Sequence, residues 1–283
     1  MMLHPRNKVE TQIPESLALI AGKGVYPLEL AASARQQGVK RLVAVAFRGE
    51  TDRAISSLVD EVLWVRLGQL DAFLDAFRQV GIKQAVMVGQ ITPTHIFRVR
   101  LDRAMLNLLS RLPVKNAETV FGAVGDELQK LGVGLLPAHL FMQSAMPAVG
   151  PLTKGAPTER QRLDIELGQR IAKATSGLDI GQTVVIKDGI VIAVEAFEGT
   201  DATILRAGKL AGPGVVIVKV AKRGHDMRFD IPVIGMHTMK TLRKARASVL
   251  ALEAGRTILL ERARVIAEAE RLGVCMLAFE IES

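Results

Sequence analysis

Short apolar runs alternate with stretches of helical spacing through the first half of the chain. Four apolar runs predict strands, at residues 17–20, 42–47, 62–65 and 85–88. Helical spacing predicts two helices, at residues 27–37, where Gly38 closes the pattern, and at residues 70–80. Strands that alternate with helices form parallel sheets, so this half predicts a Rossmann-like α/β domain.

The second half begins with a predicted helix and continues with hairpin-forming strands. Thr158 stands three residues before Gln161, the spacing of a capping box, and apolar residues follow at 163, 167 and 171. Asp188-Gly189, a pair favoured in two-residue hairpin turns, separates β-rich runs at 183–187 and 190–197. A further strand is predicted at 215–220, before a polar loop at 222–230. This half predicts a second, mixed α/β domain with antiparallel strands.

The boundary between these domains is expected in a stretch rich in proline and glycine. Residues 147–157 hold three prolines and two glycines without apolar periodicity. The sequence therefore predicts a Rossmann-like N-terminal domain at residues 1–146, a linker at 147–157, and a C-terminal catalytic α/β domain at 158–283.

Composition indicates a globular cytoplasmic protein. Apolar residues make up 49% of the chain and charged residues 23%, enough to build a core. Cys275 is the single cysteine, so no intramolecular disulfide can form and a reducing compartment is expected. The start of the chain has no signal-peptide pattern, and no apolar run approaches the ~20 residues of a membrane span.

The net charge of +8 raises the question of an anionic partner. The basic excess is spread over both halves, and one Trp and one Tyr give few platforms for stacking bases, so nucleic acid is not expected. An anionic small substrate or an anionic lipid surface explains the charge at least as well.

Residues 98–115 predict a basic amphipathic helix. Arginines and a lysine are interspersed there with leucines and a methionine. Two interpretations remain open: a helix that packs on its own domain or a second subunit, and a helix that contacts an acidic membrane or an acylated substrate.

The turn Gly22-Lys23-Gly24 follows the first predicted strand and precedes a helix. Glycines at this place let backbone amides approach a phosphate at a helix N-terminus. The third glycine of the dinucleotide fingerprint is missing, and Pro27 stands where that motif would place a small helix-packing residue. A plain tight turn, a nucleotide or phosphate contact, and an NAD site all remain open.

Carboxylates and basic side chains are mixed between residues 195 and 230. Phosphoryl transfer uses this mixture, because carboxylates hold a divalent cation or position water while Lys and Arg neutralise phosphate oxygens. Ordinary solvated loop charges are the competing interpretation. The set comprises Glu195, Glu198, Asp201, Lys219, Lys222, Arg223, Asp226, Arg228 and Asp230.

Several passages together resemble one enzyme family. The chain is similar, from about Leu17 to its C-terminus, to the UDP-2,3-diacylglucosamine pyrophosphatases of the LpxI type, and the EGTD and DMRFDIPVIG stretches are the most specific parts. The matching passages are LIAGKGVYPLELAASA, WVRLGQL, VMVGQITP, LDIGQTVVIKDGIVIAVEAFEGTDATI, KVAKRGHDMRFDIPVIG and LEAGRT.

The resemblance implies an activity and a set of site residues. It implies a lipid A pathway hydrolase that releases UMP and 2,3-diacylglucosamine 1-phosphate, with water attacking the phosphorus nearer the sugar and with Mg²⁺ or Mn²⁺ as cofactor. Asp226 matches the essential aspartate of the family's KxGQDMR stretch, while His225 replaces the usual glutamine and Ile91-Thr92-Pro93-Thr94 replaces an expected arginine-proline pair.

The resulting hypothesis gives each residue a role. The metal ligands are predicted to be Asp226, Asp230 and Glu198. The diphosphate is expected to be stabilised by Lys219, Lys222 and Arg228. Other substrate contacts are expected from Gly22, Lys23, Gly24, Glu198, Gly199, Thr200 and Asp201. The acylated UDP-sugar substrate implies peripheral contact with the anionic inner membrane, and a homodimer is expected. A Rossmann-type oxidoreductase and a non-catalytic nucleotide or lipid carrier are the alternatives.

Overall fold

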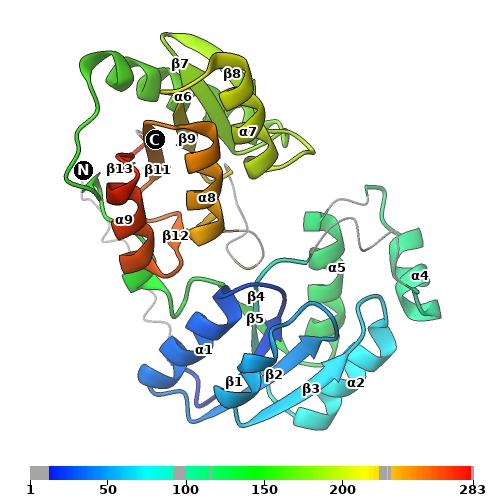
Figure 1. Cartoon of the computed structure of the whole chain (residues 1–283). Helices are drawn as coiled ribbons and strands as arrows, with labels where there is room; N and C mark the ends of the chain where they lie inside the picture. Colours follow the sequence, from blue (N-terminus) through cyan, green and yellow to red (C-terminus); the bar gives the residue numbers. More distant parts are fainter. Residues whose placement is uncertain (1–12, 92–99, 115–116, 223–227, 229–230, 282–283) are drawn as a thin grey trace, which may run out of the picture. The chain divides into compact units, whose positions relative to one another are not determined.

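The computed structural model describes residues 13–91, 100–114, 117–222, 228 and 231–281. Its contacts divide the chain into two compact units, Met1–Leu136 and Pro137–Ser283 (Figure 1). No helix of these described residues is long and apolar enough to cross a bilayer.

The first unit contains a five-stranded parallel sheet in the order β3-β2-β1-β4-β5. Its strands are β1 (Ser16–Ala21), β2 (Arg41–Phe47), β3 (Glu61–Val65), β4 (Gln84–Val88) and β5 (Gly134–Leu136). Its helices are α1 (Tyr26–Gln36), η1 (Arg53–Ser57), α2 (Leu70–Val80), α4 (Arg103–Ser110) and α5 (Ala117–Lys130).

This strand order creates a topological switch point between β1 and β4. The chain moves from β1 to β2 in one direction and from β3 to β4 in the other, and right-handed crossovers therefore place α1 and α2 on opposite faces of the sheet. The strands β1 and β4 on either side of this point are buried on both faces, which explains their nearly continuous apolar sequences. The predicted Rossmann-like domain is confirmed.

The second unit contains a six-stranded mixed sheet in the order β6-β13-β11-β9-β7-β8. The three strands β13, β11 and β9 are parallel, and β6, β7 and β8 pair antiparallel. The strands are β6 (Gly150–Pro151), β7 (Thr183–Lys187), β8 (Ile190–Val194), β9 (Val216–Lys219), β11 (Val249–Glu253) and β13 (Cys275–Phe279), with β10 (Val233–Ile234) and β12 (Ile258–Leu259) in a separate pair.

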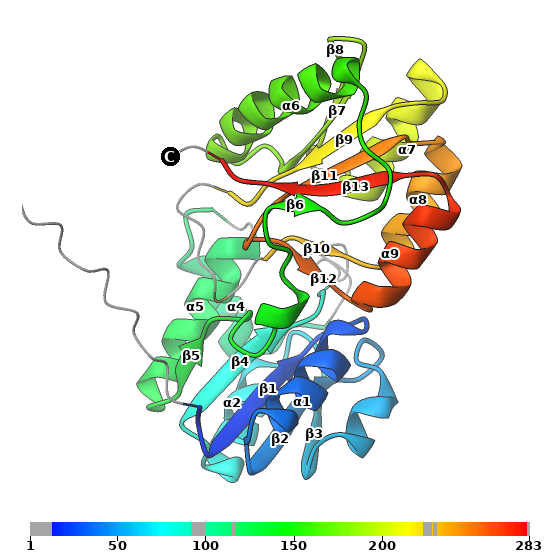
Figure 2. The ribbon, with the colours of Figure 1, turned by 90° about the vertical axis from the view of Figure 1, so that its left-hand side faces the viewer.

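Helices cover both faces of this sheet, as Figure 2 shows. The helix α6 (Glu159–Gly177) packs on one face through Ile165 and Ala172. On the other face lie α7 (Thr200–Ala211), α8 (Met236–Ala245) and α9 (Arg262–Arg271). A short helical turn, η2 (Gln143–Ala145), precedes β6.

Local signals in the second half fold as predicted. Thr158 and Gln161 form both bonds of the capping box at the start of α6. Asp188 and Gly189 both have positive φ and join β7 to β8. The Asp164 carboxylate accepts the backbone amides of both turn residues, at 3.0 and 2.7 Å.

One feature differs from the prediction. The basic helix expected over residues 98–115 is only α4, because Asp102 caps its start and accepts the Met105 amide at 2.7 Å, and it ends two residues before Leu112-Pro113. Arg98 and Lys115 lie outside the described residues.

The bounds of the two domains stay a prediction. Residues 147–157, the expected linker, contain β6, which pairs with β13. The contacts divide the chain after Leu136.

Candidate functional site

The glycine turn of the first unit lies at the switch point between β1 and β4. Parallel sheets bind ligands at the carboxyl ends of their strands, beside such points. Gly22 follows β1, and Gly89 follows β4. A Cβ on Gly22 would lie 2.7 Å from the Gln90 oxygen, and one on Gly89 would lie 2.8 Å from the Lys23 oxygen, so these two turns touch through their backbones. Glycine is required here for close approach.

Two backbone amides of this turn already donate hydrogen bonds within the fold. Gly22 N donates to the Val88 oxygen at 2.8 Å, and Lys23 N donates to the Gln90 oxygen at 2.7 Å. The bridge is reciprocal, because Gln90 N donates to the Lys23 oxygen at 3.0 Å. A phosphate contact at this turn would therefore use amides beyond Lys23, at the start of α1.

A buried lysine occupies the carboxyl end of β9 in the second unit. Lys219 has only 7% of its surface exposed. Its ammonium donates to Thr200 Oγ1 at 2.8 Å and Thr183 Oγ1 at 3.2 Å, and lies 4.0 Å from Glu195 Oε2. The antiparallel register of β7 and β9 causes this meeting, since Thr183 pairs with Lys219. The structure thus brings together Glu195, Thr200 and Lys219 from the predicted charged cluster.

The EGTD stretch forms the N-terminus of α7 beside this lysine. Gly199 is the N-cap, and its φ of 81° is a conformation that glycine adopts without strain. The free amides of a first helical turn carry partial positive charge. A lysine ammonium and a helix N-terminus therefore converge on Thr200, an arrangement suited to phosphate oxygens.

Two buried carboxylate oxygens at this end of the sheet have no hydrogen-bond partner among the described residues. They are Glu195 Oε2 and Asp201 Oδ1. The other Asp201 oxygen lies 3.2 Å from Nε2 of His237, an exposed residue at the start of α8. Buried acceptors without donors invite a proton or a cation.

Two of the predicted site residues form ion pairs with side chains outside the predicted site. The Glu198 carboxylate accepts from the Arg206 guanidinium at 2.5 Å, and this bond holds the pKa of Glu198 below its usual range. The Lys222 ammonium donates to Asp179 at 3.0 Å, an ion pair that the sequence did not indicate.

A buried ion pair fixes the start of the polar loop after β9. Lys173 donates to both oxygens of Glu253, at 2.9 and 2.8 Å, and to the Ala221 oxygen at 2.8 Å. Glu253 in turn accepts the Ala221 amide at 2.8 Å. Both backbone groups of Ala221 are therefore held, immediately before the loop that carries the predicted catalytic residues.

The centre of that loop lies outside the described residues. This applies to Arg223, His225, Asp226 and Asp230, while Arg228 is described and exposed. The described residues contain no group of three or more potential metal-ligating side chains.

Sequence reasoning missed four polar residues that shape this region. Lys173 lies within a helix, Thr183 begins a strand and Glu253 ends one. His237 is the second residue of a helix far along the chain. One signal was position, because Glu253 and Lys219 both stand at the carboxyl ends of apolar strands. A second was the resemblance, because its matching passages include Thr183 and Glu253.

Comparison with protein families gives two adjoining matches. The model of the LpxI N-terminal domain matches residues 16–145, and the model of the LpxI C-terminal domain matches residues 148–277. The UDP-2,3-diacylglucosamine pyrophosphatase LpxI of Caulobacter vibrioides is 30% identical over 275 residues, covering 93% of this chain and 97% of that protein.

Solved structures show only distant likeness. Phosphoribosylglycinamide synthetase from Anaerococcus prevotii is 12% identical with a TM-score of 0.28, over 71% of this chain and 44% of that one. A biotin carboxylase domain of a single-chain bacterial carboxylase is 15% identical with a TM-score of 0.26, over 60% and 35%. The chain spans less than half of either protein, and likenesses this weak carry no argument.

Proposed function

The chain belongs to the LpxI family, and from that premise we propose that it hydrolyses the diphosphate of UDP-2,3-diacylglucosamine to UMP and 2,3-diacylglucosamine 1-phosphate. In this reaction a water oxygen bonds to the phosphorus nearer the sugar, and the bond from that phosphorus to the bridging oxygen breaks. UMP leaves with the bridging oxygen, and the water protons pass to solvent or to a base.

The observation that carries the proposal is the buried Lys219 at the N-terminus of α7. A buried ammonium with two hydroxyl acceptors and a helix N-terminus beside it supplies fixed positive charge where water is excluded. Such preorganised charge stabilises the oxygens of a reacting diphosphate more strongly than solvent does. This part of the second unit suits substrate contacts from Gly199, Thr200 and Asp201.

The proposed reacting groups follow β9 directly. Asp226 is assigned the central role, as ligand or water-positioning base. Asp230 shares this role, and Arg228 and Lys222 assist with charge. The pair Lys173 and Glu253 supports this assignment, because it fixes Ala221 five residues before Asp226. Lys222 would have to leave Asp179 in order to reach a phosphate.

A divalent cation, Mg²⁺ or Mn²⁺, is proposed as cofactor. Hard oxygen donors suit such ions, and the oxygen of Asp201 that accepts no hydrogen bond from a described residue is a donor of that kind. Asp226, Asp230 and Glu198 would hold the ion. Glu198 would first have to release Arg206, its partner in the structure. When bound, the cation neutralises diphosphate charge that the carboxylates would otherwise repel.

The substrate class implies where the protein works. An acylated UDP-sugar resides in a bilayer, so we propose that the protein is cytoplasmic and binds peripherally to the anionic inner membrane. A homodimer is the assembly we propose, since closed symmetric dimers are the commonest oligomers.

Product analysis tests the function. Purified protein is incubated with UDP-2,3-diacylglucosamine in ¹⁸O-water, with Mg²⁺, with Mn²⁺, and after exhaustive chelation. We expect UMP and labelled 2,3-diacylglucosamine 1-phosphate, and loss of turnover without metal. Label in UMP would overturn the site of attack, full activity after chelation would overturn the metal, and binding without turnover would favour a carrier.

A further inference from the structure

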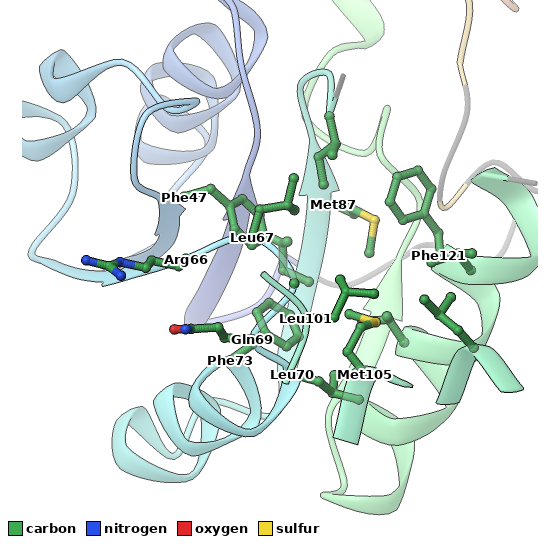
Figure 3. A pocket seen from close by; sticks show the side chains of 16 residues that line it. Phe47, Arg66, Leu67, Gln69, Leu70, Phe73, Met87, Leu101, Met105 and Phe121 are labelled. Carbon is green, nitrogen blue, oxygen red and sulfur yellow. The ribbon is translucent and has the colours of Figure 1, made fainter. Parts of the chain in front are cut away.

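The carboxyl ends of the strands differ in character between the two sheets. In the first unit they border a pocket lined by apolar side chains, where Figure 3 shows Met87, Leu101 and Phe121 gathered together. In the second unit the last residues of β9 and β11 are buried and charged, Lys219 and Glu253. Parallel sheets bind ligands at this end of their strands, and reactions of charged groups need polar groups at fixed positions. Elements that fix this end of the second sheet can therefore affect the reaction.

One short connection of the second unit holds the beginning of the polar loop at residues 222–230. This connection, residues 253–258, leads from the last residue of β11 to the first residue of β12. At its start the Glu253 carboxylate accepts the Ala221 amide at 2.8 Å. Ala221 directly precedes the polar loop, so the connection fixes the point where the loop begins.

The same connection also holds the end of the polar loop. The Ile258 amide donates to the Pro232 oxygen at 2.9 Å, at the start of the parallel pair of β10 and β12 (Figure 2). Pro232 is buried, and it follows the loop by two positions. Asp226 and Asp230 stand in the sequence between Ala221 and Pro232. Positions 253 and 258 of one connection thus fix both ends of the segment that carries the proposed reacting groups.

The connection is itself tied to the rest of the second unit. Ala254 N donates to the Phe279 oxygen at 2.8 Å, and Gly255 N donates to the Pro147 oxygen at 2.9 Å. Gly255 has a φ of 64°, a left-handed conformation that glycine adopts without strain. Residues held in this way form a rigid support, which a reacting group needs if it is to keep its position.

Thr257 is the side chain that directly precedes the second of these hydrogen bonds. It has no exposed surface, and its Oγ1 has no hydrogen-bond partner in the part of the chain that the structure describes. Its contribution is therefore one of shape. A β-branched side chain is stiff about χ1, and in a close-packed interior it restricts the backbone on either side, including the Ile258 amide.

We propose that Thr257 is a positioning residue for the reaction and acts through the Ile258 amide on the end of the polar loop. The inference rests on the proposed function, because it takes Asp226 and Asp230 as reacting groups. The enclosed side chain keeps the Ile258 N–H directed at the Pro232 oxygen, and loss of its packing lets this end of the loop shift. A misplacement of about 1 Å can cost ~100-fold in rate.

Three substitutions separate the shape of Thr257 from its hydroxyl. Thr257→Val keeps the branched shape without the hydroxyl, Thr257→Ser keeps the hydroxyl without the branch, and Thr257→Ala removes both. Thr153→Ala is the matched control. Thr153 is also buried, and its Oγ1 accepts the Met276 amide at 2.9 Å near the amino end of β13.

Two measurements on the full-length protein test the proposal, each beside thermal melting. Hydrogen exchange of the Ile258 amide reports its hydrogen bond to Pro232 and does not depend on turnover. Steady-state kinetics with UDP-2,3-diacylglucosamine separate kcat from KM. A purely structural role of Thr257 would lower the melting temperature but would not lower kcat of the folded protein.

We expect Thr257→Val to keep the wild-type kcat and the wild-type exchange rate. Thr257→Ala should lower kcat at least about tenfold and speed exchange at Ile258, with KM within about twofold of wild type because substrate contacts are kept. Thr257→Ser should show the same changes to a smaller extent. Thr153→Ala should lower the melting temperature and leave kcat within about twofold of wild type.

Three outcomes would overturn the proposal. The first is a folded Thr257→Ala with wild-type kcat, and the second is an equal loss of kcat in Thr153→Ala. The third is an inactive Thr257→Val beside an active Thr257→Ser, since the hydroxyl would then carry the effect. If Thr257→Ala does not fold, the comparison of Thr257→Ser with Thr257→Val decides the matter, and equal kcat in those two overturns the proposal.

Failure of the proposed function gives a different result. In that case the wild type itself releases no UMP, while exchange at Ile258 still rises in Thr257→Ala. Normal turnover by every variant would instead contradict the positioning role alone.

Discussion

Lys219 and Thr200 meet at the carboxyl end of β9, where the lysine ammonium donates to the threonine hydroxyl at 2.8 Å. The same hydroxyl donates to Glu195 Oε1 at 2.8 Å. A cation, a hydroxyl and an anion are thus linked in series beside the N-terminus of α7. The two residues are 19 positions apart in the sequence, and they meet because α7 packs against the sheet.

Lys219→Met should lower turnover by at least about 100-fold, because it removes preorganised positive charge from the proposed diphosphate site. Lys187→Met is the matched control on the neighbouring strand, where the ammonium donates to the Ala211 oxygen at 2.7 Å. UMP release is measured for both variants beside thermal melting. Equal activity of a folded Lys219→Met and the control would remove Lys219 from the reaction.

Asp226→Ala should abolish UMP release while leaving the fold intact. Loss of a metal ligand or water-positioning carboxylate typically costs at least ~100-fold in rate, whereas changes in surface loops usually alter stability by about 0.5 kcal/mol or less. Asp230→Ala should also be damaging. Asp75→Ala, at an exposed ion pair of α2, is the control. Turnover by Asp226→Ala within tenfold of wild type would refute the assignment.

Glu253→Gln should destabilise the fold by about 3–5 kcal/mol, because it leaves the Lys173 ammonium buried without its counterion. Glu127→Gln breaks a more exposed ion pair with Lys130 and should change stability by at most about 1 kcal/mol. Denaturant unfolding gives both values. A double variant with Met at positions 173 and 253 should recover part of the stability but not the activity, since Ala221 remains unanchored. Full activity in that variant would argue against a role in positioning the loop.

Acidification should destabilise the protein partly through His139. Burial lowers the pKa of this imidazole, and its Nδ1 has no hydrogen-bond partner among the described residues. The unfolded state therefore takes up the proton first, so stability is lost as pH falls from about 6.5, the ordinary histidine pKa, through the lower folded value. Thermal melting from pH 8 to 5 should show a smaller decline for His139→Gln than for wild type. Identical pH profiles would exclude this contribution.

Binding to anionic vesicles should depend on the exposed arginines around α4. Each basic residue near such a surface contributes ~1 kcal/mol, so Arg103→Gln with Arg111→Gln should weaken partitioning about 30-fold. The control replaces the exposed Arg48 and Arg53 of the same unit by Gln. Sedimentation with neutral and anionic vesicles, at low and high salt, measures the effect. Equal binding to both kinds of vesicle would contradict the proposed contact of α4 with the membrane and would favour packing within the protein.

The sequence by itself determined the elements that depend on neighbouring residues. The helix over residues 70–80, the capping box of Thr158 and the turn at Asp188-Gly189 involve contacts within a few positions, so their signals are complete in a short stretch. The alternation of strands and helices gave the Rossmann-like class, and the EGTD and DMRFDIPVIG passages gave the family.

Only the tertiary structure decided which charges meet. Glu198 lies in the predicted cluster yet bonds to Arg206, and Lys222 bonds to Asp179, 43 positions earlier. Lys173 and Glu253 are 80 positions apart. Position 22 must be glycine because the backbone of Gln90, in the turn after another strand, lies too close for a Cβ atom. Such partners are set by sheet register and helix packing, and a charge pattern along the chain cannot reveal them because side-chain energies depend on burial and distance in space.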